Sequence, residues 1–249
     1  MQSAVLSDFD GVLSPIVHPG EPHPVSETVR SSLRRIEAGY RLAAIITGRP
    51  AKEARELLQV EGFHVVGNFG LEELPAHRNH VRFDLAALRW RRRVRHVAKQ
   101  EWRRSLRAEG AHLGDQGLTM VFHWRGAADE DKTRLAIEAA GARAQQRGIR
   151  VQRGNKWLAF RPPVDVDKGT AVRRLLRQNS KVRYAIYFGD DTIDIPAMKA
   201  LEAMVASGRL DGAVRVAVTS PETPQALLDA ANLVVNGPSG VATVLKELT

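Results

Sequence analysis

The sequence predicts an α/β fold: a doubly wound, Rossmann-like core with a parallel sheet, into which a smaller α/β domain is inserted. Three observations predict it. Short apolar runs alternate with amphipathic helical segments at both ends of the chain, which is typical of parallel βαβ units. Polar motifs rich in Asp, Gly and Thr follow these runs directly, where open parallel sheets bind ligands. Between the two halves, strands recur at hairpin spacing, which indicates antiparallel pairing.

The N-terminal half provides the first part of the parallel sheet. Buried strands are expected over residues 5–7, 41–46 and 64–67. Ser26 is expected to cap a helix that ends at Gly39, because apolar residues between them recur at helical spacing. A second helix is expected over 51–58. The loop over 14–24 contains four prolines and two histidines, so we expect irregular structure there.

The pattern changes near Pro75. Further on we expect an arginine-rich helix over 85–109, a strand over 118–124, a helix over 130–147 and a hairpin of 149–152 with 157–160. These elements indicate an antiparallel sheet with helices on one face. We therefore assign residues 76–162 to the inserted domain and residues 1–75 and 163–249 to the core.

The parallel pattern resumes in the C-terminal part. A helix is expected to begin at Lys168, and another near Pro196. Further strands are expected over residues 184–188, 214–218 and 233–235, followed by a closing helix. This arrangement completes the strand and helix alternation of a doubly wound core.

Composition limits the class of protein. With 249 residues and 43% hydrophobic residues, the chain can bury a sizeable core. No apolar run approaches the roughly 18 residues of a membrane span, and the N-terminus has no signal-peptide pattern. The absence of cysteine excludes disulfides and thiolate metal sites. We expect a cytoplasmic protein without a membrane partner.

The formal net charge of +9 favours anionic partners such as phosphorylated metabolites, nucleic acid or acidic surfaces. The excess is concentrated in the arginine-rich helix. We interpret this helix mainly as a solvated face, because long Arg side chains cover apolar surface with their stems. Nucleic acid is the less favoured partner, since aromatic residues are few and no nucleic-acid motif accompanies the basic run. Protein partners are left open.

Four polar signals stand at strand ends or helix starts of the core. They are Asp8 and Asp10 after the first strand, Thr47 after the second, Lys168 at a helix start, and Asp190, Asp191 and Asp194 after a later strand. Parallel topology would gather them at one edge of the sheet. Carboxylates in such proximity repel one another unless a cation joins them, and oxygen ligands favour Mg²⁺.

This set of side chains suits phosphoryl transfer. A Lys ammonium and a Thr hydroxyl can hold a phosphoryl group, while a metal ion neutralises its charge. One carboxylate can act as the nucleophile, and a second can protonate the leaving oxygen and then activate water.

The order and spacing of these signals resemble the haloacid dehalogenase-like hydrolase superfamily, which has four such motifs. The resemblance implies that Asp8 is the nucleophile and Asp10 the general acid and base, with Thr47 and Lys168 binding the phosphoryl group. It also implies a Mg²⁺ site made by Asp8, the backbone carbonyl of Asp10, and Asp190, supported by Asp194 with Asp191 nearby. An insertion between the second and third motifs is similar to the branch with an α/β cap.

Within that branch the chain looks most like the trehalose-6-phosphate phosphatases, over almost its whole length. The segments that carry this resemblance are 45–49, 67–72, 120–125, 161–162, 166–171 and 236–242. The resemblance implies substrate contacts from Gly48 and Arg49 in the core. Arg125, Lys156 and Arg161 are the expected substrate-binding residues of the cap.

The chain departs from the family pattern at several positions. The first motif has Val12 where Thr is usual, Phe69 stands where His is usual, and Ala159 stands where Glu is usual. The segment after Asp194 also differs. The second and third departures lie in regions that shape or contact the sugar, so they bear on specificity and not on phosphate chemistry.

The sequence therefore predicts a Mg²⁺-dependent phosphatase that hydrolyses trehalose 6-phosphate through an aspartyl phosphate. The alternative is a phosphatase for another glycosyl phosphate, such as sucrose 6-phosphate or a mannosyl or glucosyl phosphoglycerate. A phosphomutase and a basic nucleic-acid-binding protein with a vestigial site are less favoured alternatives.

Overall fold

The computed structural model describes residues 2–17, 21–22 and 24–249, and its described residues form two compact units. The first unit contains the described residues of 1–16, 22–82 and 166–249, and the second those of 17–21 and 83–165. The domain boundaries after residues 75 and 162 stay a prediction. The irregular loop expected over 14–24 lies partly outside the described residues.

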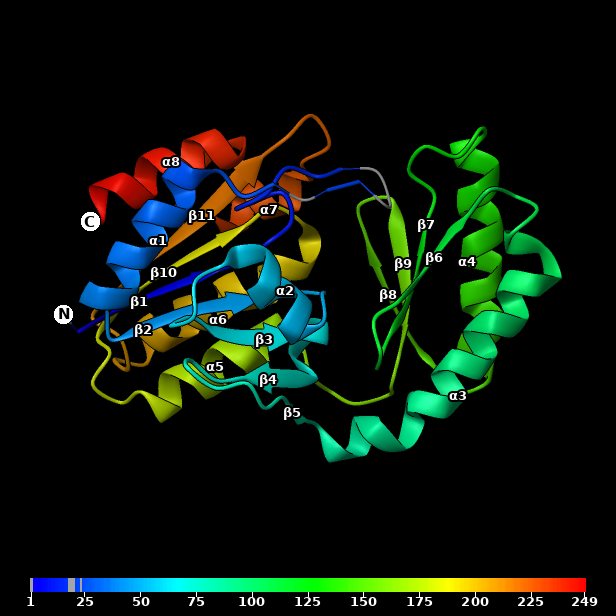
Figure 1. Ribbon diagram of the computed structural model, residues 1–249, viewed down its shortest axis with the longest axis horizontal. Helices are drawn as coiled ribbons and strands as arrows, with labels where there is room; N and C mark the ends of the chain where they lie inside the picture. The colour runs from blue at the N-terminus through cyan, green and yellow to red at the C-terminus, as the bar shows by residue number, and fades with distance from the viewer. Residues whose placement is uncertain (1, 18–20, 23) are drawn as a thin grey trace. The chain divides into compact units, whose positions relative to one another are not determined.

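An eight-stranded sheet runs through the first unit in the order β12-β11-β10-β1-β2-β3-β4-β5 (Figure 1). The strands that pair in parallel are β1 (Ser3–Ser7), β2 (Leu42–Ile46), β3 (His64–Gly67), β10 (Tyr184–Gly189), β11 (Gly212–Thr219) and β12 (Leu233–Asn236). β4 (Glu72–Leu74) is antiparallel to β3, and β5 (Arg82–Phe83) is the edge strand. Because β1 lies between β10 and β2, its C-terminal end lies in the middle of the row formed by the C-terminal ends of the parallel strands.

Helices cover both faces of this sheet (Figure 1). One face packs against α1 (Glu27–Gly39), α2 (Ala51–Leu58) and α8 (Gly237–Glu247), and the other against α5 (Lys168–Gln178), α6 (Ile195–Ala206) and α7 (Gln225–Ala230). This three-layer arrangement confirms the predicted doubly wound parallel core.

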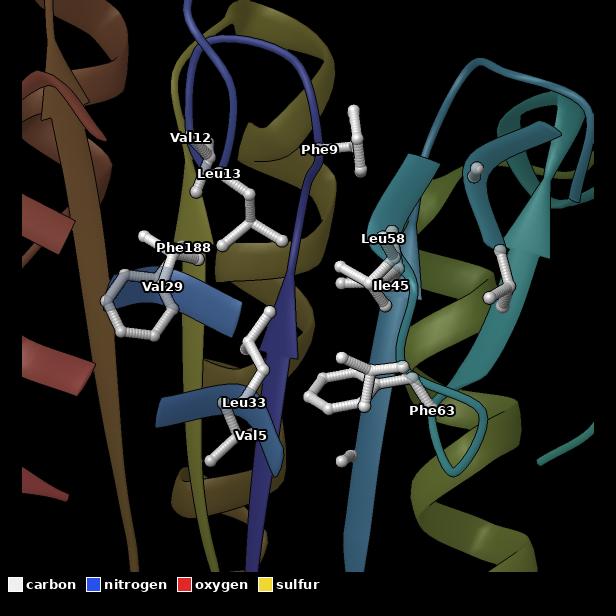
Figure 2. Close-up of a cluster of buried hydrophobic side chains, with 14 of the residues drawn as sticks. Val5, Phe9, Val12, Leu13, Val29, Leu33, Ile45, Leu58, Phe63 and Phe188 are labelled. Carbon is white, nitrogen blue, oxygen red and sulfur yellow. The ribbon is translucent and has the colours of Figure 1, made fainter. Parts of the chain in front are cut away.

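The central strands are apolar on both sides because each faces two helix layers. In β1, Val5 belongs to the cluster under α1, whereas Ala4 and Leu6 belong to the cluster under α5 and α6. Figure 2 shows Val5 beside Leu33 of α1, with Phe188 of β10 in the same cluster. The sheet is thus rigidly held from both faces up to the edge at which the polar motifs begin.

Side chains cap two helix N-termini, of which the cap at Ser26 was predicted. The Ser26 hydroxyl accepts a hydrogen bond from the Val29 N–H at 3.3 Å, so α1 begins one residue after Ser26. Asp167 forms a capping box with Thr170 at the start of α5, with the Thr170 N–H 2.7 Å from the Asp167 carboxylate. This box fixes Lys168 as the first residue of α5.

The second unit is a four-stranded antiparallel sheet in the order β6-β7-β9-β8. Its strands are β6 (His112–Asp115), β7 (Met120–His123), β8 (Arg150–Gly154) and β9 (Trp157–Arg161). The helices α3 (Leu85–Glu101) and α4 (Glu130–Gln146) share one apolar cluster with β7 and β9. The predicted antiparallel sheet with helices on one face is therefore confirmed.

Several elements differ from the sequence-based expectations. The arginine-rich helix ends at Glu101 and continues as one wider turn, Trp102–Leu106. β4, β6 and α7 were not predicted, since each is short and carries little periodic signal. Among the described residues, no helix combines the length and apolar character that a membrane span requires.

Arg55 of α2 ties together the loops that flank β3 and β4. Its side chain is buried, and its guanidinium donates to the carbonyls of Phe63 at 2.7 Å and of Leu74, Pro75 and Arg78 at 3.0 Å. A buried carbonyl that loses its donor costs free energy, because water cannot replace it.

We expect Arg55→Met to lower the free energy of unfolding by about 2–4 kcal/mol, because it leaves these carbonyls without their donor. Urea denaturation followed by circular dichroism measures this change. Arg34→Met is the matched control, since the Arg34 side chain is 52% exposed and pairs with the exposed Glu27. Equal stability of the two variants would contradict the role given to Arg55.

Candidate active site

The predicted motifs meet at the C-terminal edge of the first unit's parallel sheet. Asp8 directly follows β1, Thr47 follows β2, Asp190 follows β10, and Lys168 begins α5. Two backbone hydrogen bonds extend the ladder by one residue: the Asp8 N–H donates to Phe188 O and the Thr47 N–H to Val66 O, each at 2.9 Å. Asp8 and Thr47 thus leave the sheet in fixed directions.

The ammonium of Lys168 joins two carboxylates. Its Nζ lies 2.7 Å from Oδ2 of Asp8 and 2.7 Å from Oδ1 of Asp194. All three side chains are buried. Burial by itself would lower the pKa of Lys168, but Asp194 and Asp8 raise it above its usual value. Lys168 is therefore a permanent positive charge between the two strand ends.

Asp194 is the most extensively hydrogen-bonded of the carboxylates. Its Oδ2 accepts the N–H groups of Asp190 and Asp191, each at 3.2 Å, and the Tyr187 hydroxyl donates to its Oδ1. Asp191 instead points to its own turn, where its Oδ1 accepts the Thr192 N–H at 2.6 Å. Asp194 therefore organises the 3-10 turn Thr192–Asp194, and Asp191 caps it.

Asp8, Asp190 and Asp194 form a cluster suited to a metal ion. One carboxylate oxygen of each lies within 4.8 Å of the others. Among the described residues, no hydrogen-bond donor contacts the Asp190 carboxylate. Lys168 contacts two of these three carboxylates, and the carboxylate oxygens form a ligand set that fits a divalent cation.

Burial is the main cause of the raised pKa values of Asp8 and Asp190 in this cluster, and neighbouring carboxylates add to it. Burial raises the pKa of Asp8 to about 7, although Lys168 lowers it and Asp194 raises it further. Burial also raises the pKa of Asp190 well above its usual value, and the neighbouring charge of Asp8 adds to this. A bound cation would reverse both shifts, because it favours the ionised carboxylates.

A glycine lets the turn after β1 approach this cluster. Gly11 has φ +75°, and a Cβ atom there would lie 1.9 Å from Oδ2 of Asp190. Any larger residue would therefore displace the Asp190 carboxylate. The Gly in the first motif is required by both the left-handed backbone and the close approach.

Asp10 lies outside the carboxylate cluster. Its two carboxylate oxygens accept hydrogen bonds from Nε and Nη2 of Arg49, both at 2.8 Å. Arg49 also pairs with Glu53 through Nη1. The sequence-based assignment gave Arg49 to the substrate and a metal contact to the Asp10 backbone, so this pairing of their side chains was not anticipated.

Thr47 and Gly48 form the turn between β2 and α2. Thr47 is buried, and its hydroxyl oxygen lies 3.2 Å from the Arg49 N–H. A Cβ atom on Gly48 would lie 2.7 Å from the ring of Phe69. Phe69 itself has a left-handed backbone with φ 59°, directly after Asn68 with φ 48°. This departure from the family pattern therefore packs against the candidate phosphate-binding turn.

The three expected cap residues belong to the second unit. Lys156 pairs with Glu130 at 2.8 Å. Arg161 is buried, and its guanidinium contacts the side-chain oxygen of Gln152 on the neighbouring strand. Ala159 is fully buried and lies opposite Gln152 in the β8–β9 register. Arg125 follows β7 in the same unit.

Sequence reasoning missed three side chains. Glu53 follows Arg49 by four residues at the start of α2, so helical spacing could have indicated the pair. Gln152 could have been found from the hairpin register, which places it opposite Ala159. Tyr187 carries no local signal, because an aromatic residue in a buried strand is ordinarily a packing residue.

Comparison with known proteins identifies the family. The pattern of the trehalose-phosphatase family matches residues 6–223. Probable trehalose-phosphate phosphatase D of Arabidopsis thaliana is 29% identical over 212 residues, which cover 80% of this chain and 57% of that protein. Trehalose 6-phosphate phosphatase RA3 of Zea mays is 27% identical over 218 residues, which cover 82% of this chain and 60% of that protein.

Solved structures show the same fold. The C-terminal domain of the Candida albicans trehalose-6-phosphate phosphatase superposes with a TM-score of 0.83 at 20% identity, covering 99% of this chain and 92% of that one. A trehalose-6-phosphate phosphatase related protein superposes with a TM-score of 0.75 at 21% identity, covering 98% and 96%. This chain spans less than two thirds of the plant relatives above. The match over residues 6–223 shows that the chain belongs to the trehalose-phosphatase family.

Proposed function

We propose that this protein is a Mg²⁺-dependent phosphatase that hydrolyses trehalose 6-phosphate to trehalose and phosphate through an aspartyl phosphate on Asp8. The observation that carries the proposal is the buried cluster of Asp8, Asp190 and Asp194 around Lys168 at the edge of the parallel sheet. The names of the relatives support the substrate.

Asp8, Asp190 and Asp194 would hold the Mg²⁺, with the Asp10 backbone carbonyl as a further ligand and Asp191 as a neighbour. Bound there, the ion would act as a Lewis acid that neutralises charge on the phosphoryl oxygens. The donor set consists of oxygens only, as Mg²⁺ prefers. The carboxylate of Asp191 has a structural role at the turn, so its contribution to the metal is the weakest.

In the first step, Asp8 attacks phosphorus. Lys168 binds Oδ2 of Asp8, which leaves the second oxygen for the attack. The bond between phosphorus and the sugar oxygen breaks, and Asp10 gives its proton to that oxygen. Thr47 and the backbone around Gly48 hold the phosphoryl oxygens, with the Lys168 ammonium beside them. Trehalose leaves, and Asp8 carries the phosphoryl group.

In the second step, water attacks the phosphorus of the aspartyl phosphate while Asp10 takes a proton from that water. The bond between phosphorus and the Asp8 oxygen breaks, so phosphate is released and the Asp8 carboxylate is restored. Asp10 has regained the proton that it donated. The sum of the two steps is trehalose 6-phosphate plus water giving trehalose plus phosphate.

Residues of the second unit bear on the choice of sugar. Ala159 brings no polar group to β9, but the side-chain oxygen of Gln152 on the next strand contacts Arg161. We propose that Arg125, Lys156 and Arg161 contact the sugar. A different glycosyl phosphate is the alternative substrate that these departures allow.

We expect Asp8→Asn to lower phosphate release from trehalose 6-phosphate by at least about 10³-fold, because an amide oxygen is a poor nucleophile. A colorimetric phosphate assay with and without Mg²⁺ measures this. Asp131→Asn, at a carboxylate that is 90% exposed, is the control and should retain wild-type turnover. Unchanged turnover in Asp8→Asn would contradict the role of Asp8 as the nucleophile.

The raised pKa of Asp8 gives a stability prediction. Because it is about 7 instead of 3.8, the metal-free folded protein keeps a proton that the unfolded chain releases between about pH 4 and pH 7. The folded state therefore loses stability as the pH rises through this window. With a chelator present, we expect the Tm of the wild type to fall by several degrees more than that of Asp8→Asn between pH 5 and pH 8.

The same pair of proteins reports on the metal. At pH 8, Mg²⁺ should raise the Tm of the wild type more than that of Asp8→Asn, since the variant lacks one ligand. Differential scanning fluorimetry over a Mg²⁺ series measures both effects. Parallel pH curves and equal Mg²⁺ shifts would contradict the assignment of Asp8 to the metal cluster.

The substrate assignment is tested by phosphate release from a panel. We expect the highest kcat/KM with trehalose 6-phosphate, compared with sucrose 6-phosphate and mannosyl and glucosyl phosphoglycerates. A preference of tenfold or more for one of the others would replace trehalose as the sugar. Retention of phosphate on the product would indicate a phosphomutase, and salt-sensitive nucleic-acid binding without turnover would favour the vestigial site.

A further inference from the structure

The Asp10 carboxylate is held in a two-bond fork. Nε and Nη2 of Arg49 lie 2.8 Å from Oδ2 and Oδ1 of Asp10, so both carboxylate oxygens and both donors are used. Such parallel bonds fix the orientation of a carboxylate as well as its position. Asp10 lies beyond the end of β1, where its backbone forms an isolated bridge with Ser14.

Arg49 is held more firmly than Asp10. Its Nη1 pairs with Glu53, and its guanidinium lies over the ring of Phe9 with 5.7 Å to the ring centroid. The Arg49 side chain is 13% exposed, against 37% for Asp10. The guanidinium is thus anchored by groups other than Asp10, as a support for a second side chain requires.

The backbone of Arg49 is fixed as well. Its N–H lies 3.2 Å from the Thr47 hydroxyl oxygen, and its carbonyl accepts the Asn68 N–H at 2.8 Å. Arg49 therefore connects the turn after β2 to the turn after β1. A change in one turn would reach Asp10 through this side chain.

We propose that Arg49 is the positioning residue for Asp10, fixing the carboxylate in the orientation from which it transfers protons. The inference rests on the proposed function, in which Asp10 protonates the leaving sugar oxygen. It assigns to Arg49 a role through Asp10, in place of the direct substrate contact expected from the sequence. Lys is a point donor without the fork, so it should replace Arg49 only in part.

Two substrates separate positioning of the acid from binding of phosphate. The leaving oxygen of a sugar phosphate is strongly basic and needs a proton as it departs, whereas 4-nitrophenolate leaves without one. Asp10 also takes part in the later attack of water, which is the same for both substrates, whereas kcat/KM reports only the steps up to departure of the leaving group. A defect in Asp10 orientation should therefore lower kcat/KM for trehalose 6-phosphate and change it little for 4-nitrophenyl phosphate. A lost phosphate contact should appear with both.

We expect Arg49→Gln to lower kcat for trehalose 6-phosphate by about 10–100-fold with KM within about threefold of wild type. With 4-nitrophenyl phosphate, kcat/KM should change by less than about threefold. Arg49→Lys should fall between wild type and Arg49→Gln. Glu53→Gln should give a smaller loss in the same direction, because it releases one anchor of the guanidinium.

A double-mutant cycle tests whether Arg49 acts through Asp10. In an Asp10→Asn background, Arg49→Gln should lower kcat further by less than about twofold. Effects that multiply in the double variant, or a tenfold rise in KM with both substrates and kcat retained, would overturn the inference.

Arg183→Gln is the matched control, because Arg183 also holds a carboxylate, that of Asp211, with two donors. It should leave kcat and KM unchanged for both substrates. Melting temperatures establish whether each variant is folded. If Arg49→Gln does not fold, Arg49→Lys takes its place in the kinetic tests. Absence of turnover in the wild type itself would overturn the proposed function and this inference together. An active wild type with effects that multiply in the double variant would overturn this inference alone.

Discussion

The first unit depends on one buried ammonium, that of Lys168. Moving a single charge out of water costs several kcal/mol, and this cost is offset only if the charge is paired and hydrogen-bonded. Lys168 meets that condition by bonding Asp8 and Asp194, each at 2.7 Å. Because these carboxylates follow β1 and β10, and Lys168 begins α5, the three segments can close only together. Removing Lys168 would leave both carboxylates without their charged partner in the interior.

The single positive charge of Lys168 does not neutralise the negative charge of the three carboxylates in this cluster. Asp190 stands in the same cluster, with no donor to its carboxylate among the described residues. Burial raises the pKa values of Asp8 and Asp190, and the neighbouring carboxylates raise them further. A largely buried site with surplus negative charge suits a divalent cation, and such a cation would in turn attract a phosphoryl group. The surplus negative charge therefore lowers the stability of the metal-free folded state, and it supports the proposed chemistry.

Asp10 stands apart from this cluster although it is only two residues from Asp8. In a continuous strand both side chains would face one side. The chain leaves β1 at Ser7, however, and the turn that Gly11 permits carries Asp10 toward Arg49. Asp8 thus remains with the carboxylates of Asp190 and Asp194, while Asp10 acquires a guanidinium partner of its own. That separation suits two carboxylates with different chemical roles.

The sequence alone determined the parallel core, because apolar runs and helical periodicity are local signals, and it determined which side chains meet at the sheet edge, because parallel topology orders strand ends. It also carried the cap of α1 at Ser26 and the hairpin of β8 and β9. Short elements such as β4, β6 and α7 contain too few residues to show a periodic pattern of apolar residues. Only the tertiary structure decided the partners: Lys168 between Asp8 and Asp194, Arg49 on Asp10, and Gln152 on Arg161. Those pairings depend on which loops lie close together in the folded chain, and the periodicity of the sequence does not determine which loops these are.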